Sequence, residues 1–330
     1  MADVSVVIVN YNGRQYLGEL LDSLACQVQP ADEVILVDNA SSDGSADYVR
    51  QKFPWVDVIR LPENVGFAEG NNVGVAQSRG QYVALLNSDT VVEERWLAEL
   101  VRALEADDAI GAVVPKIYKA HAYPRLDCAG AEFNSLGVSW GRGANCVDGG
   151  QYELPMEVAA VTGCSVLLRR TALADDPIFD AKLFMYYEEL DLSLRLRGRG
   201  YSVLYVPTAI VHHKGSQAVA EVARQPVLFQ QFYGNRNRLK ILLKYYPVGI
   251  LLRNLPLIVL SLLYWDVYFL RYGGPRFAAR ALRQQAAFAR AGLRERAQAR
   301  EVRPHRWIPW MKQQGIRELR DLRATFPAAG

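Results

Sequence analysis

Short apolar runs alternate with amphipathic helical stretches through residues 4–114, and this alternation constrains the fold more than any other feature of the chain. In the stretch 16–24, for example, leucines recur with the spacing of one helix face. Strands joined by helices need crossover connections, so the strands run mostly parallel and helices cover both faces of their sheet. The predicted strands are 4–9, 34–37, 56–61, 82–86 and 110–114, and the predicted helices are 16–24, 46–53, 68–78 and 96–106. The sequence therefore predicts an α/β fold with a mostly parallel, Rossmann-like central sheet.

The rest of the chain departs from this regular alternation. Residues 121–160 are rich in glycine and small polar residues, which predicts an irregular, β-rich insertion over the edge of the sheet. Two further strands, 158–169 and 202–211, flank a helix at 185–197. Long apolar runs and then an arginine-rich helical stretch follow Tyr245. A chain of 330 residues can bury a large core, so we expect a main domain over 1–240 and a C-terminal helical extension over 241–330.

Polar residues collect where the predicted strands end. The segments that leave four strands are 10–13, 38–44, 63–67 and 87–90, and each is rich in Asn, Asp or Gly. Any one of them could be a simple turn. Four on the same side of an open α/β sheet favour a ligand site, because ligands bind at the carboxyl ends of the strands. The first turn lacks GxGxxG and no GxxxxGK[ST] occurs, which disfavours dinucleotide-dependent oxidoreductases and P-loop NTPases.

Six ordered motifs resemble a known family. They are SVVIVNYNG, VDNASSDGS, NVGFAEGNNVG, LLNSDT, VTGCSVLLRR and YYEELDLSLRLRGRGY. Their order is similar to that of family 2 glycosyltransferases of the GT-A fold, and most similar to the bacterial rhamnosyltransferase-like branch that builds surface polysaccharides. The resemblance spans residues 3–240. It implies an enzyme that moves a sugar from a nucleotide-diphosphate donor to a hydroxyl acceptor, with inversion at the anomeric carbon.

The resemblance also implies a donor site at the strand ends. Asp38 matches the carboxylate that accepts the N3–H of a uracil or thymine base, and the chemistry fits because a pyrimidine imide offers one donor between two carbonyls. The other donor-binding candidates are Val9, Asn10 and Tyr11 beside the base, and Asn64, Gly66, Phe67, Asn71 and Asn72 in the ribose- and sugar-facing segment. Asn71 and Asn72 could instead satisfy local backbone groups.

A metal site is implied at Asn87-Ser88-Asp89, where the family carries its DxD motif. Asp89 is the expected ligand of a divalent cation, Mg²⁺ or Mn²⁺, that neutralises the diphosphate leaving group. Asn87 replaces the first carboxylate of the motif, which predicts weak metal affinity without the nucleotide. His212 and His213 follow a predicted strand at a position where relatives bind the metal or the diphosphate. Alternation puts them on opposite faces, and His212 is the preferred candidate.

An inverting transfer needs one carboxylate to take the proton of the acceptor hydroxyl. The candidates are Glu188, Glu189 and Asp191, at the start of a predicted helix. The family pattern E-D-x-D-L assigns the role to Glu189. The alternative is structural, because acidic residues are favoured in the first turn of any helix, and Asp191 can pair with Arg195 four residues later.

The C-terminal extension resembles a membrane-associating region. Between Arg253 and Arg271 lie 17 mostly apolar residues with an acid inside, which is short for a spanning helix. An in-plane amphipathic segment fits better, with Tyr264, Trp265 and Tyr268 at the headgroup level. An anionic membrane surface would attract the arginines that follow, at 276, 280, 283, 290, 294, 296, 300, 303 and 306. The alternative is a helical hairpin packed on the main domain or on a second subunit as a homodimer. No recognition motif points to nucleic acid.

The expected donor is dTDP-rhamnose, and the expected acceptor is a lipid-linked glycan or a growing surface polysaccharide. The alternatives are a UDP-hexose or UDP-N-acetylhexosamine transferase of the same fold, or a catalytically silent scaffold that binds nucleotide sugars. Four scattered cysteines without CxxC spacing are typical of reduced thiols, and the first apolar run lacks a basic leader. We therefore expect a cytoplasmic protein, peripheral on the inner face of the cell membrane.

Overall fold

The computed structural model describes residues 3–174, 176–215, 226–297, 299 and 302–311. Its strands are β1 (Val4–Asn10), β2 (Glu33–Asp38), β3 (Asp57–Arg60), β4 (Tyr82–Asn87), β5 (Thr90–Val92), β6 (Ile110–Lys119), β7 (Leu126–Cys128), β8 (Ala131–Phe133), β9 (Ser139–Gly141), β10 (Met156–Glu157), β11 (Ser165–Arg169) and β12 (Ser202–His213). Its α-helices are α1 (Arg14–Ala25), α2 (Ser45–Lys52), α3 (Gly66–Gln77), α4 (Trp96–Glu105), α5 (Arg170–Leu173), α6 (Glu188–Arg199), α8 (Pro226–Tyr245), α9 (Val248–Tyr268) and α10 (Gly274–Glu295). A π-helical turn, Phe269–Gly273, joins the last two.

One mixed sheet forms the centre of the molecule. Its order is β10-β12-β6-β11-β4-β1-β2-β3, with β5 on β12 and β7 on β6. The strands β1, β2, β3, β4, β6 and β12 all run in one direction, because β11 lies antiparallel between β4 and β6. The predicted α/β fold with a mostly parallel sheet is confirmed.

The predicted strand 158–169 is wrong in its first half. Only Ser165–Arg169 forms a strand. The residues before Ser165 pair with other parts of the chain. The N–H of Val158 donates to the carbonyl of Val203, and Ala160 forms a bridge with Ala131. The apolar run therefore does not form one continuous strand.

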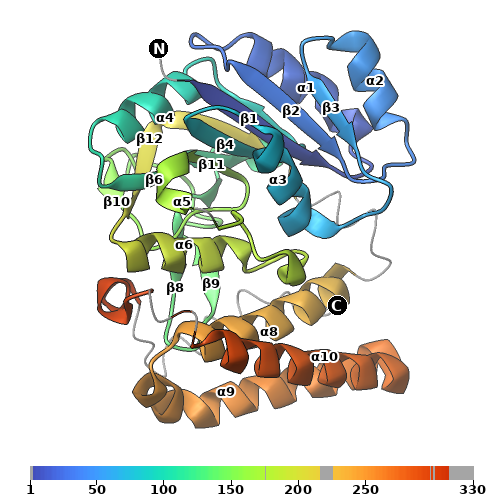
Figure 1. Cartoon of the computed structure of the whole chain (residues 1–330), viewed down its shortest axis with the longest axis vertical. Coiled ribbons are helices and arrows are strands. Elements are labelled where there is room, and N and C mark those ends of the chain that lie inside the picture. The colour runs from blue at the N-terminus through green and yellow to red at the C-terminus, as the bar shows by residue number, and fades with distance from the viewer. Residues whose placement is uncertain (1–2, 175, 216–225, 298, 300–301, 312–330) are drawn as a thin grey trace.

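Helices cover both faces of the sheet, as Figure 1 shows. Alternation along β1 points Val6 and Ile8 to one face and Val7 to the other. The first face packs against α1, α2 and α4, and the second against α3, α5 and α6. Leu17 and Leu20 of α1 are fully buried, and each such side chain contributes about 2 kcal/mol of hydrophobic stabilisation.

A third layer is made by α8, α9 and α10, which lie side by side below α6 in Figure 1. The predicted domain boundary at residue 240 falls inside α8, so this helical layer begins earlier in the chain than expected. Packing between α8 and α10 is tight, since a Cβ on Gly292 would lie 2.6 Å from the carbonyl oxygen of Lys240. A core between α6, α8 and α9 includes Leu194, Ile241 and Ile258. The helical hairpin packed on the main domain is therefore present.

The outer side of α9 remains uncovered in the described structure. Its exposed large apolar residues are Val248, Leu252, Leu255, Leu257, Val259, Leu260, Leu263, Tyr264 and Val267. Trp265 was expected at a membrane surface but is buried against Phe269, so that prediction is wrong for this residue. Among the described helices, the continuous stretch Val248–Glu295 contains one segment long and apolar enough to cross a membrane by length and composition. Of the expected basic tail, Arg300 lies outside the described residues, as do residues 312–330.

Candidate active site

The carboxyl edge of the sheet gathers the polar strand ends. Asn10, the last residue of β1, lies opposite Asp38 at the end of β2, and Val9 lies opposite Asn87 at the end of β4. His213, the last residue of β12, pairs with the first residue of β5. The strand register therefore brings the ends of β1, β2, β4 and β12 to one edge, which is where open α/β sheets bind ligands.

Asn10 and Asp38 form a buried polar pair at this edge. Asn10 Nδ2 donates to Oδ1 of Asp38 at 3.4 Å and to Oγ of Ser41 at 3.2 Å. Asn10 Oδ1 is buried and has no hydrogen-bond partner in the described structure, an arrangement that is costly unless a ligand supplies a donor. Tyr11 follows on the partly exposed side, and Val9 packs beneath α3. Asn10 Oδ1 can therefore accept a hydrogen bond from a ligand bound beside Tyr11.

Asn39 organises the start of α3, although it was not among the predicted site residues. Its Nδ2 donates to Asn64 Oδ1 at 3.0 Å and to the carbonyl of Gly66 at 3.1 Å, and its Oδ1 accepts from Val65 N–H at 2.9 Å. Gly66 has a φ of 87°, which glycine adopts at little cost. These bonds fix the turn that leads into α3. The only sequence signal for Asn39 is its place directly after Asp38 in the same motif.

Asn71 and Asn72 are engaged inside the protein. Asn71 Nδ2 donates to the carbonyl of Phe67 at 2.8 Å, one turn earlier in α3. Asn72 exchanges two hydrogen bonds with the backbone of Phe179, at 3.0 and 2.9 Å, and the Phe67 ring packs on that of Phe179. The structure favours the alternative role for both asparagines, because their amides satisfy backbone groups and tie α3 to the segment before α6.

Asp89, His213 and Asp127 form a line of side chains at the end of β4. His213 Nε2 lies 3.2 Å from Asp89 Oδ1, and Nδ1 lies 2.8 Å from Asp127 Oδ2. Burial by itself lowers the pKa of His213, but Cys164 and the two carboxylates more than offset burial and raise it well above its ordinary value. Asp127 lies in β7, within the segment that shows no periodicity, so no sequence pattern pointed to it.

Asn87 and Ser88 shape the turn that carries Asp89. The backbone N–H of Asn87 donates to the carbonyl of Cys164 at 2.9 Å, and its own carbonyl accepts from Thr90 Oγ1 at 2.7 Å. Ser88, between Asn87 and Asp89 in the sequence, is buried. Both hydrogen bonds hold the turn against β11 and β5, so the position of Asp89 is fixed by its neighbours.

His212 points away from this line. Its Nε2 lies 3.1 Å from Oε1 of Glu93, and its ring stacks on Tyr118 at a centroid distance of 5.9 Å. The structure therefore favours His213, and not the preferred His212, as the partner of Asp89. Alternation along β12 did place the two rings on opposite faces, but Asp89 lies on the side of His213.

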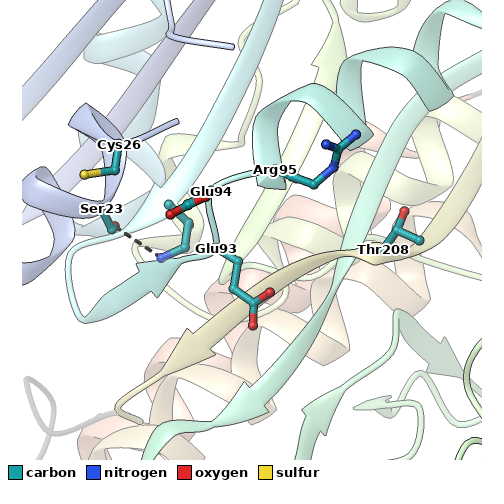
Figure 2. A pocket seen from close by; sticks show the side chains of 7 residues that line it. Ser23, Cys26, Glu93, Glu94, Arg95 and Thr208 are labelled. Atoms are coloured by element: carbon teal, nitrogen blue, oxygen red, sulfur yellow. Dashed lines mark hydrogen bonds between the residues drawn. The ribbon is translucent and has the colours of Figure 1, made fainter. Parts of the chain in front are cut away.

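A shallow depression of about 460 Å³ lies outside the predicted site and is bordered by Val92, the last residue of β5 (Figure 2). Glu93, the partner of His212, borders it. Its lining residues are Ser23, Cys26, Val92, Glu93, Glu94, Arg95 and Thr208. None of the predicted site residues lines this depression, so it is not a candidate for donor binding.

Asp89 and His213 fit a divalent cation as part of a coordination sphere once the cation displaces the proton that the two carboxylates hold on His213. A carboxylate oxygen and an imidazole nitrogen face each other, and both atom types serve as ligands of divalent metals. Asp127 behind the ring has the place of a carboxylate that orients a metal-binding histidine. Within the described ranges, no group of three or more His, Cys, Asp and Glu is arranged to hold a metal ion. A cation here would need further ligands from a bound diphosphate or water.

The acidic residues at the start of α6 lie in different environments. Glu188 is 4% exposed, and its Oε2 has no hydrogen-bond partner in the part of the chain described. Burial, and then the neighbouring charge of Glu189, raises the pKa of Glu188. Burial also raises the pKa of Glu189, whose side chain is partly accessible. Glu189 is therefore a carboxyl that can be reached and that holds its proton more tightly than an exposed one.

Asp191 is occupied by structural partners. Its Oδ1 accepts from Lys244 Nζ at 3.0 Å and from the Tyr245 hydroxyl at 2.8 Å, and its Oδ2 accepts from Arg195 Nε at 2.9 Å. Burial raises its pKa, but Lys244 and Arg195 outweigh burial and hold the pKa of Asp191 well below its ordinary value. Both oxygens are already committed to donors, so the structure favours the structural role of Asp191.

Comparison with known proteins identifies the class. Residues 5–175 match the family described as glycosyl transferase family 2. The chain belongs to this family. It is 30% identical over 238 residues to an N-acetylglucosaminyl-diphospho-decaprenol L-rhamnosyltransferase of Mycobacterium tuberculosis, with 65% of this chain and 77% of that relative covered. The expected membership, on the rhamnosyltransferase-like side of the family, is confirmed.

Solved structures agree on the fold. GalNAc-T7 with UDP, GalNAc and Mn²⁺ superposes with a TM-score of 0.57 at 19% identity, over 75% of this chain and 49% of that one. A mannosyltransferase of Pyrobaculum calidifontis in complex with GDP-Man and Mn²⁺ superposes with a TM-score of 0.53 at 18% identity, over 92% and 88%. The expected GT-A fold is therefore confirmed.

Proposed function

We propose that this glycosyltransferase moves rhamnose from dTDP-rhamnose to a hydroxyl of a lipid-linked or surface-polysaccharide acceptor, with inversion at the anomeric carbon. The observation that carries the proposal is the Asp89–His213 pair, at the same sheet edge as the buried Asn10–Asp38 pair. The first pair suits a diphosphate and a cation, and the second suits a pyrimidine base. The activity for which the mycobacterial relative is named supports both the rhamnosyl donor and the lipid-diphosphate acceptor.

In this proposal the nucleotide lies across the ends of β1, β2 and β4. Asp38 accepts the N3–H of the thymine, and Asn10 offers its unpartnered Oδ1 to a donor of the ligand. Asp89 and His213, after His213 gives up its proton, would hold Mg²⁺ or Mn²⁺, which would neutralise the charge that develops on the diphosphate. The turn at Asn64 and Gly66 supports the sugar side of the donor.

Glu189 is the proposed general base. The acceptor hydroxyl attacks the anomeric carbon from the face opposite the diphosphate, and Glu189 takes its proton. The C–O bond to the diphosphate breaks as the new glycosidic bond forms, which inverts the configuration without a covalent enzyme intermediate. Burial raises the pKa of Glu189, which makes its carboxylate a stronger base than an exposed glutamate.

Calorimetric titration of dTDP and UDP, with and without Mn²⁺, tests the donor site. We expect Mn²⁺ to strengthen nucleotide binding, and we expect Asp89→Ala and His213→Ala to lose that enhancement. His212→Ala is the matched control, because its ring lies on the other face of β12 and bonds Glu93. Preference for dTDP supports rhamnose as the sugar, and preference for UDP favours the UDP-sugar alternative. Failure of both nucleotides to bind under every metal condition would overturn the proposal.

We further propose that the enzyme works in the cytoplasm as a peripheral protein on the inner membrane face. The uncovered apolar side of α9 supports this, because it faces away from the rest of the protein. Seven arginines and two acids lie between residues 248 and 295, at 253, 271, 276, 280, 283, 290 and 294 for the arginines and 266 and 295 for the acids. An apolar stripe bordered by arginines is complementary to a lipid surface with anionic headgroups.

A further inference from the structure

The backbone that leads into α6 is strained. Phe184, Tyr186 and Tyr187 all have positive φ angles, of 67°, 67° and 73°. At Phe184 the angles are φ 67° and ψ −62°, and the N–H of Met185 donates to the carbonyl of Leu183 at 2.8 Å, which together define a γ-turn of the rare, strained kind. Such conformations persist only where the surroundings hold them, and Glu188 and Glu189 follow at once.

One fully buried side chain of α8 bonds this segment. Asn237 Nδ2 donates to the carbonyl oxygens of Leu183 at 2.9 Å, Met185 at 2.9 Å and Tyr186 at 2.8 Å. Its Oδ1 accepts from Arg236 Nε at 3.2 Å, so the amide nitrogen must face the carbonyls. A primary amide has two hydrogens, and three acceptors share them here. Asn237 is thus matched to the three carbonyls of Leu183, Met185 and Tyr186, while the carbonyl of Phe184 between them bonds elsewhere.

The opposite side of the turn contacts the proposed donor segment. The carbonyl of Phe184 accepts from the N–H of Ala68 at 3.0 Å. A Cβ on Gly66 would lie 2.5 Å from the Phe184 ring, so only glycine permits this contact. The same ring stacks on Tyr233 of α8, with centroids 5.0 Å apart and planes at 18°. The turn therefore lies between α3 and α8, and a shift of α8 would move it.

We propose that Asn237 is a positioning residue for the general base. It holds the strained turn and so fixes where α6, and with it Glu189, begins, and it acts through the backbone of residues 183–187 without touching substrate. This inference rests on the proposed function, in which Glu189 is the base. It extends the catalytic unit to α8, beyond the residues 5–175 that match the family.

The test compares Asn237→Ala and Asn237→Asp with Asn254→Ala, in the full-length protein. Asn254 is the matched control, because its Nδ2 bonds the carbonyl of Ile250 within its own helix. Rhamnose transfer from dTDP-rhamnose to N-acetylglucosaminyl-diphospho-decaprenol gives kcat and KM, calorimetry gives dTDP affinity with Mn²⁺, and thermal melting reports folding. We expect kcat to fall at least roughly tenfold in both Asn237 variants, while dTDP affinity and the control stay near wild type. Asn237→Asp should be the worse, because its carboxylate faces three carbonyl oxygens.

The acid limb of the kcat pH profile gives a second readout. Loss of the Asn237 hydrogen bonds to residues 183–186 changes the burial of Glu189. The pH of the acid limb should therefore shift in Asn237→Ala and stay unchanged in Asn254→Ala. If Asn237→Ala does not fold, Asn237→Ser keeps one donor in a smaller side chain and should give an intermediate kcat. Folded Asn237 variants with unchanged kcat and an unchanged pH profile would overturn the proposal. Loss of both dTDP binding and the melting transition in Asn237→Ala, Asn237→Asp and Asn237→Ser would also overturn it, because Asn237 would then be needed for folding.

Glu189→Gln separates a failure of the proposed base from a failure of the positioning role of Asn237. If Glu189→Gln keeps the wild-type kcat, the proposed base is wrong and the positioning role falls with it. If Glu189→Gln is inactive while Asn237→Ala keeps its kcat, only the positioning role is wrong.

Discussion

Glu188 and Glu189 both lie in the first turn of α6, and both have a raised pKa. They differ in accessibility, which decides whether each can contact an acceptor. Glu188 is enclosed, and its unpartnered Oε2 has no solvent to reach. Glu189 is partly accessible and can meet an acceptor. A base must be ionised to accept a proton, so its raised pKa sets the lower pH limit of the reaction.

The acid limb of kcat/KM should therefore lie above pH 4.5, the ordinary value for a glutamate. Activity falls as pH drops through the raised pKa, because Glu189 becomes protonated. Glu189→Gln should lose roughly 100-fold or more in kcat at neutral pH and lose this limb. Glu188→Gln is the control of equal size and should keep most of its turnover. A limb at or below pH 4.5 in the wild type would count against Glu189 as the base.

Asp127 offers a test of the metal site that does not depend on turnover. Its carboxylate bonds His213 Nδ1, which orients Nε2 toward Asp89. Asp127→Asn should weaken the binding of Mn²⁺ in the presence of dTDP by roughly 10- to 100-fold, measured by calorimetry. Glu93→Gln removes the carboxylate that bonds His212 and should leave Mn²⁺ binding unchanged. Equal effects of the two substitutions would contradict the assignment of His213.

Among the elements, α6 and α8 are joined by a buried charge cluster. Lys244 and Tyr245 of α8 meet Asp191 of α6, which also holds Arg195. Removing one partner of a buried ion pair strands the others. Asp191→Asn should therefore lower the free energy of unfolding by about 3 kcal/mol at pH 7, measured by urea denaturation. Arg79→Gln, which removes the 84% exposed side chain that pairs with Glu33, should cost less than about 1 kcal/mol.

The same cluster predicts a pH dependence of stability. The folded pKa of Asp191 lies below its unfolded value of about 3.9, so the stabilisation is complete well above that pH. As pH falls through about 4, the unfolded chain binds the proton first and the stabilisation is lost. The difference between wild type and Asp191→Asn should therefore shrink between about pH 5 and pH 3. A constant difference over this range would show that packing, not charge, explains the loss.

The helices and strands also show which parts of the fold could be predicted from the sequence. The five predicted strands of the α/β half are all present. Four of them are apolar runs that are mostly buried, and β3 lies at the edge of the sheet and is only partly buried. The antiparallel placement of β11 was not predicted, since a strand's direction leaves no mark on its own residues. Asp127 and Asn237 were missed for a related reason. One lies in an aperiodic insertion and the other on a helix behind the site, and only tertiary packing brings them to His213 and to the turn before α6.

At the scale of the whole molecule, the proposed membrane association depends on the surface of the third layer, made by α8, α9 and α10. This surface includes exposed apolar residues of α9 and exposed arginines of α10, at 276, 280, 283, 290 and 294. A symmetric dimer through this surface would bring its arginines close to their own copies. An anionic bilayer instead meets both features favourably.

Vesicle flotation of the full-length protein checks this. We expect it to float with equimolar phosphatidylglycerol and phosphatidylcholine, to float less with phosphatidylcholine alone, and to be released by salt. Leu260→Gln combined with Leu263→Gln should abolish flotation. Leu154→Gln changes an exposed leucine of the insertion and is the control. A protein that never floats but dimerises in analytical ultracentrifugation, with the dimer lost in the double variant, would assign the surface to a second subunit.

The pairing of β5 with β12 has a consequence for how this site can vary. Asp89 precedes β5 directly, and the ladder sets His213 opposite Thr90. A single-residue insertion or deletion within 210–213 would exchange one imidazole for its neighbour while every backbone hydrogen bond could re-form. The register of β12 against β6 is already irregular between Val206 and Ile210, so a length change before that point can be absorbed there. The early part of β12 can therefore vary in length, whereas the length of its last four residues determines which histidine faces Asp89 in the proposed metal site.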